Sequence, residues 1–329
     1  MCGIHSNNTD GVVYSFLFVL HPKDYYLFVL IFYALILLAG CSSDARVNSD
    51  SEDLATGAIQ DNYEVLIANK SIISFPGLGD KQSMAFYGNK AVFVNGNYCE
   101  IYDLVSFKRE SQLSLPSEYY DPPHANTLCM GRDKFSVNSY FPALYVSSWD
   151  NGRHAFVYDF SCSGRYFEAS LVQVIDPGYV SKEIIGEGYL DWVVDSDGGY
   201  LYAVAYHLKN TSTTIEGNYT HITRFVLPSL EQKVVTLRDS DVIDSFVIPV
   251  MTIFQDKCFS NGNLYVAAGH PGLGTEFSPK LFSINVLSKK MTEYNLPFNG
   301  EPEGLCYYEG KLWLNLYGDS NIYRIDIQI

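Results

Sequence analysis

Basic residues are scarce in this 329-residue chain, which has 22 Lys and Arg against 37 Asp and Glu and a net charge of -15. A surface of that sign repels phosphate backbones and anionic lipid, so nucleic acid is not expected as a partner. The short motifs of several enzyme classes are also missing. The chain contains no G-x-S-x-G elbow, no H-E-x-x-H pair, no C-x-x-C and no phosphate-binding glycine loop. No catalytic signature therefore identifies an activity.

Long helical periodicity is absent beyond the first forty residues, and short alternating runs take its place. The last stretch, 300–327, has two apolar/polar runs separated by a tight turn with Gly310, and a third run after Gly318. Alternation with glycine-containing turns predicts strand, hairpin, strand, turn and strand. This unit is interpreted as one repeat.

Earlier parts of the chain repeat the same pattern, which gives five copies in all. The first strands of the copies are predicted to start at Gln82, Asn126, Asp191, Gln255 and Glu303. The second strands are predicted at Ala91, Leu144, Leu201, Leu264 and Leu312, and the third at Glu100, Ala155, Ile222, Leu281 and Ile322. A spacing of about 45 to 65 residues with three to four strands per copy is typical of a β-propeller.

The fifth copy ends after its third strand. Its fourth strand can come from 64–68 and 71–75, which precede the first copy and have no sheet of their own. Pairing the two chain ends would remove the exposed edge of an open sheet. The sequence thus predicts an all-β, five-bladed propeller closed by an N-terminal strand. A six-bladed alternative would need a hidden blade between Phe160 and Ile185.

The N-terminal region is predicted to lie outside this fold. Lys23 precedes an apolar run over 25–38, which ends in Leu38-Ala39-Gly40-Cys41. That ending resembles the lipobox of bacterial lipoproteins, in which the signal peptide is removed and the new N-terminal cysteine carries lipid. The alternative is a single transmembrane anchor, because the run is close to spanning length.

This resemblance implies a domain division and a location. Residues 1–40 would be a lipoprotein signal peptide, 41–61 a flexible polar tether and 62–329 the propeller domain. Lipid on Cys41 would attach the chain to the bacterial outer membrane, facing the periplasm or exposed at the surface.

Three cysteines occupy the same place in the repeat. Cys129, Cys258 and Cys306 each follow the first residue of their copy by three positions. A small apolar core position accounts for all three, and we expect them to be free thiols because neighbouring blades diverge.

Two sets of polar residues are predicted to meet on one face of the propeller. In this fold the first strand of each blade starts on the face that carries the turns between second and third strands. The ring residues, defined as the five first residues of the copies, would therefore surround the mouth of the central channel. The candidate ligand-binding residues are Gln82, Asn126, Asp191, Gln255, Glu303, His124, Glu301, Trp149, Asp150, His270 and Tyr317.

Several interpretations of this face remain open. Polar side chains around a wet channel can serve structure alone. Asp191 and Glu303 carry the oxygen ligands that calcium prefers, so a Ca²⁺ ion in the channel is one alternative to having no cofactor. Trp149 beside Asp150 suits a sugar ring and its hydroxyls. His124 is the catalytic candidate to test first.

The repeat pattern over 64–329 resembles bacterial lipoproteins that carry a β-propeller domain. Glu301-Pro302-Glu303-Gly304 before an apolar strand is similar to the step that begins inner strands in NHL/TolB-like propellers. Only this copy keeps the glycine, and the others have Ser83, Thr127, Trp192 and Asp256. Plant-type glutaminyl cyclases are similar in rhythm, but their Glu-Gly-Trp-Gly and Asn-Glu-Leu-Glu motifs are absent, so their activity is not implied.

Two functions follow as expectations. The first is a lipid-anchored cell-envelope binding module that recognises a glycan or a partner protein at the mouth. The second is a carboxylate- or metal-dependent hydrolase or lyase that acts at the same place.

Overall fold

A computed structural model of the chain describes residues 59–64, 66–116, 125–148, 153–164, 166–207, 219–249 and 253–327. These ranges all belong to one compact unit, 53–329. The predicted signal peptide, Cys41 and most of the predicted tether lie outside the described residues. Within these ranges no helix is long and apolar enough to cross a membrane.

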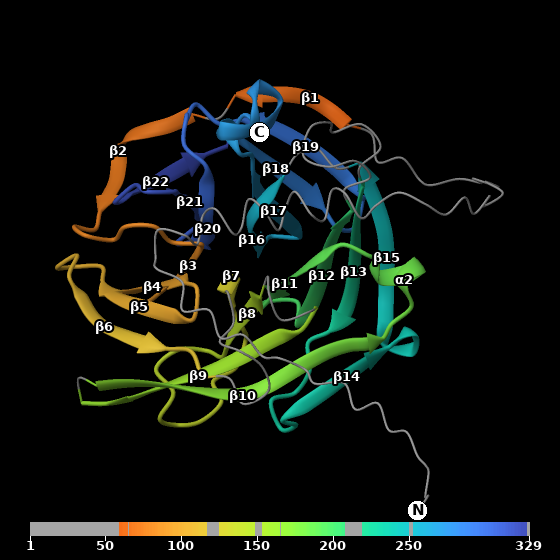
Figure 1. Ribbon diagram of the computed structural model, residues 1–329, viewed down its shortest axis with the longest axis horizontal. Helices are drawn as coiled ribbons and strands as arrows, with labels where there is room; N and C mark the ends of the chain where they lie inside the picture. The colour runs from red at the N-terminus through yellow and green to blue at the C-terminus, as the bar shows by residue number, and fades with distance from the viewer. Residues whose placement is uncertain are drawn as a thin grey trace, which may run out of the picture. The chain divides into compact units, whose positions relative to one another are not determined.

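The described strands form five sheets of four or five strands, and each sheet is one blade (Figure 1). Blade one holds β3 (Ser83–Tyr87), β4 (Lys90–Asn95), β5 (Tyr98–Asp103) and β6 (Arg109–Ser114). Blade two holds β7 (Ala125–Met130), β8 (Leu144–Ser148), β9 (Ala155–Ser163), β10 (Tyr166–Tyr179) and β14 (Val234–Arg238). Blade three holds β11 (Tyr189–Asp195), β12 (Tyr200–His207), β13 (Tyr219–Val226) and β15 (Val242–Pro249).

The last two blades each include a strand from the start of the described chain. Blade four holds β16 (Phe254–Ser260), β17 (Asn263–Ala268), β18 (Lys280–Asn285), β19 (Lys290–Asn295) and β1 (Ile59–Glu64). Blade five holds β20 (Pro302–Tyr308), β21 (Lys311–Leu316), β22 (Asn321–Asp326) and β2 (Leu66–Ser74). Short helices α2 (Lys182–Ile185), η1 (Asp239–Asp241), η2 (Pro271–Leu273) and η3 (Thr275–Phe277) lie between strands.

The first strand of each blade is the innermost, and these five strands form a closed ring. Strand β3 contacts β7, β7 contacts β11, β11 contacts β16, β16 contacts β20, and β20 contacts β3. Each of these strands begins at, or within two residues of, the residue from which its copy was predicted to start. The predicted five-bladed propeller is confirmed.

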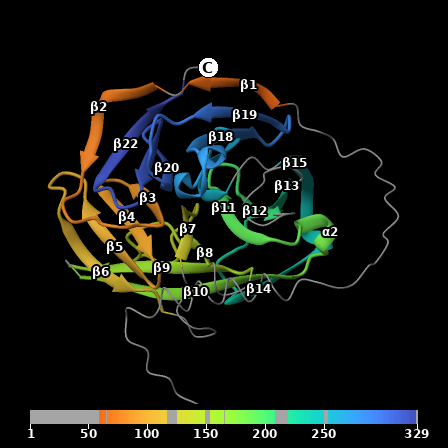
Figure 2. The same cartoon turned by 45° about the horizontal axis from the view of Figure 1, so that its top comes forward.

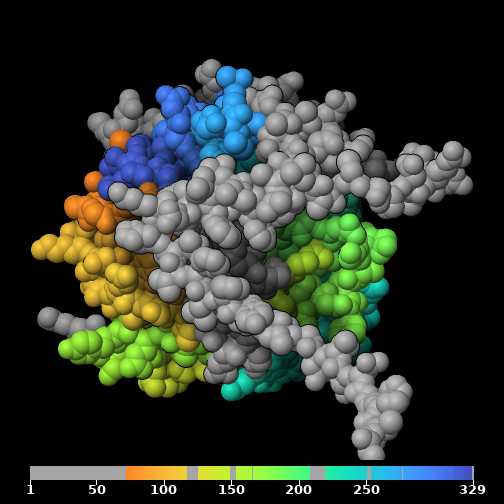
Figure 3. All heavy atoms as spheres, viewed as in Figure 1, coloured from red at the N-terminus to blue at the C-terminus, as the bar shows by residue number. Residues whose placement is uncertain are grey.

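Blade five is completed by the stretch that precedes the first copy, as the sequence predicted. Strand β2 pairs antiparallel with β22, with Ile73 opposite Ile322 and Ser74 opposite Asn321. In Figure 2 the orange β2 runs beside β22, and Figure 3 shows orange atoms between the blue C-terminal strands and the yellow first blade. Phe75 follows β2 and is fully buried. Its ring packs edge-on against Phe93 and Tyr102, at 5.4 and 5.2 Å between centroids, so blade five is fastened to blade one.

Strand β1 was not predicted as a separate strand. It pairs parallel with β19 in blade four and begins at Ile59, inside the stretch expected as tether. The N-terminal segment therefore covers the outer edges of two adjacent blades instead of one, and it protects both edges from pairing with other chains.

The six-bladed alternative is wrong, because no sixth sheet is present among the described residues. The region 160–185 forms the end of β9, all of β10 and α2. Strands β9 and β10 make a long antiparallel hairpin in blade two, from Ser163 opposite Tyr166 to Ala155 opposite Ile175. The extra length extends an outer strand that β14 then joins.

Alternating apolar residues bury both faces of the blades, and the interfaces between blades are the core. Trp192 is fully buried beside Phe225, and Tyr202 of blade three stacks on Phe259 of blade four with 5.0 Å between ring centroids. Burying a side chain of this size stabilises the fold by roughly 1.5–3 kcal/mol. The cysteines of the described chain are all free, as expected for the three in the repeat.

Candidate functional site

Polar residues gather where the innermost strands begin, on the face that also carries the turns between second and third strands. These turns are held against the strand starts of the same blades. Tyr317 N donates to Glu301 O at 2.8 Å, and Gly269 N donates to Ile253 O at 2.8 Å. The structure therefore brings Glu301 and His270, which the sequence assigned to different segments, to the mouth beside the ring residues.

Asp191 is held by a lysine that sequence reasoning missed. Lys257 Nζ lies 2.5 Å from Asp191 Oδ2, and the two side chains are 0% and 7% exposed. Asn126 Nδ2 donates to the other carboxylate oxygen at 3.4 Å. The ammonium group also lies 5.4 Å from the centre of the Phe254 ring. Because unpaired buried charges are costly, this pair fixes blade three to blade four at the mouth.

Glu301 forms a second polar group with Gln255 and His270. Gln255 Nε2 donates to Glu301 Oε1 and, at 3.3 Å, to Gly269 O. His270 Nδ1 lies 3.4 Å from Glu301 Oε2, and these side chains are 40% and 20% exposed. Burial raises the pKa of Glu301, although the imidazole and the Gln255 amide oppose that shift. A ligand can therefore reach an imidazole and a carboxyl group that are already oriented toward each other.

Glu303 has the most altered acidity of the carboxyl groups at the mouth. It is 5% exposed. Burial raises its pKa to about 9, and the charges of Glu301, Asp256 and Asp80 add to the shift. At neutral pH this carboxyl group keeps its proton and can donate a hydrogen bond, whereas an ordinary glutamate only accepts.

A buried network crosses the ring just below the mouth. Ser83 Oγ donates to Asp256 Oδ2 at 2.7 Å and accepts from Leu128 N at 2.9 Å. Leu305 N donates to the same carboxyl oxygen of Asp256 at 2.6 Å. Burial raises the pKa of Asp256 well above its usual range. The network joins the innermost strands of blades one, two, four and five.

Ser83 and Asp256 of this network stand at the repeat position that Gly304 occupies in blade five. Ser83 and Asp256 looked like departures from the repeat, and their shared signal was a polar residue at that position. Gly304 does need to be small, because an added Cβ would lie 3.1 Å from Asn315 Cβ and 3.3 Å from Met84 Cγ. Lys257 gave no signal of its own, since it precedes a cysteine in a strand predicted to be buried.

The remaining candidates either lie at the rim or fall outside the described residues. Gln82 is partly exposed, with its N–H donating to Val94 O at 2.9 Å, and Tyr317 is half exposed at the rim. His124, Trp149 and Asp150 lie outside the described residues. Within the described ranges, no group of three or more His, Cys, Asp or Glu side chains is placed to hold a metal ion.

No protein-family model and no curated protein matches the chain. Among solved structures, the chain is similar to Myxococcus xanthus glutaminyl cyclase, with 10% identity, a TM-score of 0.51 and coverage of 81% of this chain and 98% of that one. It also matches virginiamycin B lyase from Staphylococcus aureus, at 10% identity, a TM-score of 0.37 and coverage of 78% and 99%. The Neurospora crassa Pan2 WD40 domain matches at 10% identity, a TM-score of 0.39 and coverage of 82% and 98%.

At such identities the likeness concerns the fold alone. The described strands make the chain a five-bladed β-propeller, and its likeness to the Myxococcus xanthus structure is one of fold.

Proposed function

We propose that this protein is a lipid-anchored binding module of the bacterial cell envelope that recognises a glycan at the mouth of its channel. The observation that carries the proposal is the cluster at the mouth, where the Glu301 carboxyl group lies 3.4 Å from the His270 imidazole. Glu303 follows two residues along the chain, and burial raises its pKa to about 9. Sugar hydroxyls donate and accept hydrogen bonds at once. The neutral Glu303 carboxyl group can donate a hydrogen bond to one sugar hydroxyl. Glu301 can accept a hydrogen bond from a second hydroxyl, and the His270 imidazole can donate to or accept from it.

The rest of the proposal comes from sequence. Leu38-Ala39-Gly40-Cys41 supports the lipid anchor on Cys41 and attachment to the outer membrane. Trp149 and Asp150, which the repeat pattern assigns to a turn between second and third strands, would extend the glycan contacts. The net charge of -15 also suits a neutral ligand better than an anionic one.

A thermal-shift panel tests this proposal on the full chain in detergent. Neutral oligosaccharides are added one at a time, since a ligand that binds only the folded state raises the unfolding midpoint. We expect at least one oligosaccharide to raise the midpoint, and Glu301→Ala to abolish the shift. Glu309→Gln is the matched control, because Glu309 lies in the β20–β21 turn on the opposite face. A shift that survives Glu301→Ala, or none across the panel, would contradict glycan binding at the mouth and favour a partner protein.

A calcium ion is tested in the same panel. The candidate ligands are Asp191 and Glu303, and a chelator-sensitive midpoint that Asp191→Asn removes would support the ion. The Lys257 ammonium already occupies one oxygen of Asp191, which argues for a ligand that needs no metal.

A hydrolase or lyase acting at the mouth is the second candidate. The raised pKa of Glu303 favours it, because a carboxyl group that keeps its proton can act as a general acid. Glu301 and His270 would stand beside it as the second carboxyl group and an imidazole. The variant Glu303→Gln separates the two functions. A binding module should lose affinity only modestly, whereas an enzyme should lose roughly 10²–10⁴-fold in rate on any substrate that it turns over.

A further inference from the structure

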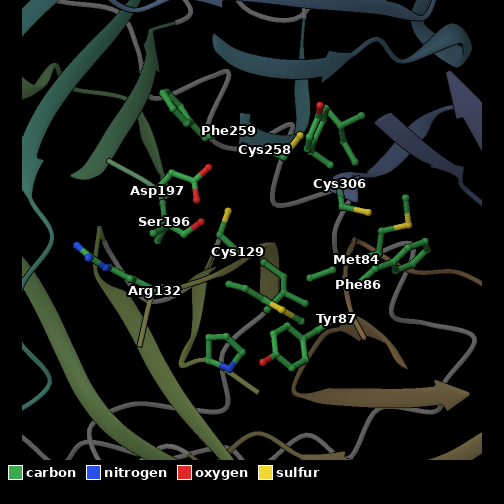
Figure 4. Close-up of a pocket in the computed structure, with 18 residues that line it drawn as sticks. Met84, Phe86, Tyr87, Cys129, Arg132, Ser196, Asp197, Cys258, Phe259 and Cys306 are labelled. Atoms are coloured by element: carbon green, nitrogen blue, oxygen red, sulfur yellow. The ribbon is translucent and has the colours of Figure 1, made fainter. Parts of the chain in front are cut away.

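A solvent-open cavity of about 500 Å³ lies at the other end of the five innermost strands. Its lining comes from all five blades, at the turns that lead from first to second strands. Figure 4 shows Met84, Cys129, Cys258 and Cys306 set around one space, each on a different innermost strand. Cavities of roughly 300–1,000 Å³ are the usual size for small-molecule sites.

The three repeat cysteines give this cavity an unusual lining. Cys129, Cys258 and Cys306 are 7%, 8% and 5% exposed, whereas the core cysteine Cys99 is fully buried. Burial raises the pKa of Cys129 to about 12, and the pKa values of Cys258 and Cys306 are raised as well. The thiols are therefore neutral and unreactive at physiological pH. They present soft, polarisable surface instead of charge.

This sulfur set is not arranged as a metal site. Within the described part of the chain, no three thiol, imidazole or carboxyl groups come together as ligands. Neutral thiols instead favour aromatic rings, since sulfur–aromatic contacts are attractive. The walls include Phe259, which is held by stacking on Tyr202, and Tyr87, which packs on Phe141 at 6.0 Å.

The cavity is separated from the mouth. The buried network of Ser83 and Asp256 crosses the ring between the two ends. The Cys129 thiol also donates to Lys257 O and Trp192 O, both at 3.8 Å, so blades two, three and four are joined at this level. A ligand at one end does not touch the side chains of the other.

Polar groups line the cavity as well. Ser196 and Asp197 lie in the β11–β12 turn, and Arg132 follows β7. We propose that this cavity is a second binding site, which takes a small aromatic molecule with a polar end. The ring would lie against the sulfur atoms and apolar strand residues, and the polar end would face Ser196 and Asp197.

The probe for this site is 4-fluorophenol, followed by fluorine NMR during titration of the full chain in detergent. We expect saturable binding at one site. Ser196→Trp and Asp197→Trp should each weaken it by at least ~10-fold, because a bulky ring at these positions occupies the polar side of the cavity. Asp197 is exposed, so its variant is expected to fold even if the Ser196 variant does not. The unfolding midpoint of each variant shows whether that variant is folded.

Two controls make the outcome specific. Ser288→Trp places the same ring in the exposed β18–β19 turn and should leave binding unchanged. Glu303→Gln at the mouth should also leave it unchanged. The proposal is overturned if the native chain shows no saturable binding, if the folded Trp variants at 196 and 197 bind like Ser288→Trp, or if Glu303→Gln removes binding. Failure of glycan binding at the mouth would not affect this result.

Discussion

Replacing Lys257 with methionine is expected to destabilise the fold strongly. Methionine keeps the length and apolar stem of the side chain but removes the ammonium group that lies 2.5 Å from Asp191. The Asp191 side chain, 7% exposed in the native fold, would then keep the Asn126 amide at 3.4 Å as its hydrogen-bond partner in the described part of the chain. Breaking a buried ion pair from one side costs about 3–5 kcal/mol.

The measurement is urea denaturation of the purified chain, followed by intrinsic fluorescence at pH 7. The variants Lys257→Met, Asp191→Asn and the double variant form a thermodynamic cycle. If the loss comes from an unpaired carboxylate, the double variant should recover at least about 2 kcal/mol relative to Lys257→Met, because no buried charge remains. A loss below about 1 kcal/mol for Lys257→Met, or no recovery in the double variant, would refute this account of the pair.

Two further predictions concern Glu303 and the ring closure. The native state holds a proton on Glu303 up to pH about 9, whereas the unfolded state releases it near the ordinary glutamate pKa, so this group's contribution to stability falls as pH rises between those values. Between pH 5 and 8 the unfolding free energy of Glu303→Gln should fall by at least about 1 kcal/mol less than that of the native chain. The control Glu309→Gln should follow the native curve. Parallel curves for the two variants would contradict the prediction. Phe75→Ala should cost about 3–5 kcal/mol in a urea melt, because it leaves a cavity at the join between blades five and one. Ile72→Ala in the preceding strand β2, at 50% exposure, should cost under about 1 kcal/mol, and equal losses would show that closure does not depend on Phe75.

The repeat was visible in the sequence because each copy follows the same physical rules. A strand that is buried on both faces needs apolar residues on either side of its pleat, and glycine is favoured in the tight turns. Gly310, with φ of 75°, forms such a turn between β20 and β21. The same rules show why β2 was identified, since its apolar run required a sheet and blade five lacked a strand.

Elements that depend on long-range pairing left weaker signals. Strand β1 contains Gln60 and Asp61, whose polarity was interpreted as tether. It forms a strand because the edge of β19 offers backbone hydrogen bonds that no local pattern reveals. Strand β14 also depends on long-range pairing. The chain leaves blade three after β13, and β14 pairs parallel with β10 of blade two.

The sequence placed Asp191, Glu301 and Glu303 at the mouth together with Asn126, Gln255 and His270, but it did not reveal the lysine that pairs with Asp191. Asp191, Glu301 and Glu303 were identified because their repeat positions place them at one end of the innermost strands. Lys257 and Asp256 were missed because the sequence around Cys258 does not show which residues of the other innermost strands they contact. Their partners lie 66 residues away at Asp191 and 173 residues away at Ser83. Contacts of that separation follow from ring closure rather than from local spacing.

The proposed site depends most directly on the protonation of Glu303. Side-chain carboxyl carbons of labelled glutamate can be followed by ¹³C NMR during a pH titration, with Glu303→Gln identifying the signal. The account predicts a carboxyl resonance that titrates at a pKa of about 9 and is missing from the variant. A Glu303 carboxyl group that titrates near 4.5, as an ordinary glutamate does, would contradict the proton donor at the mouth and the proposed function that rests on it.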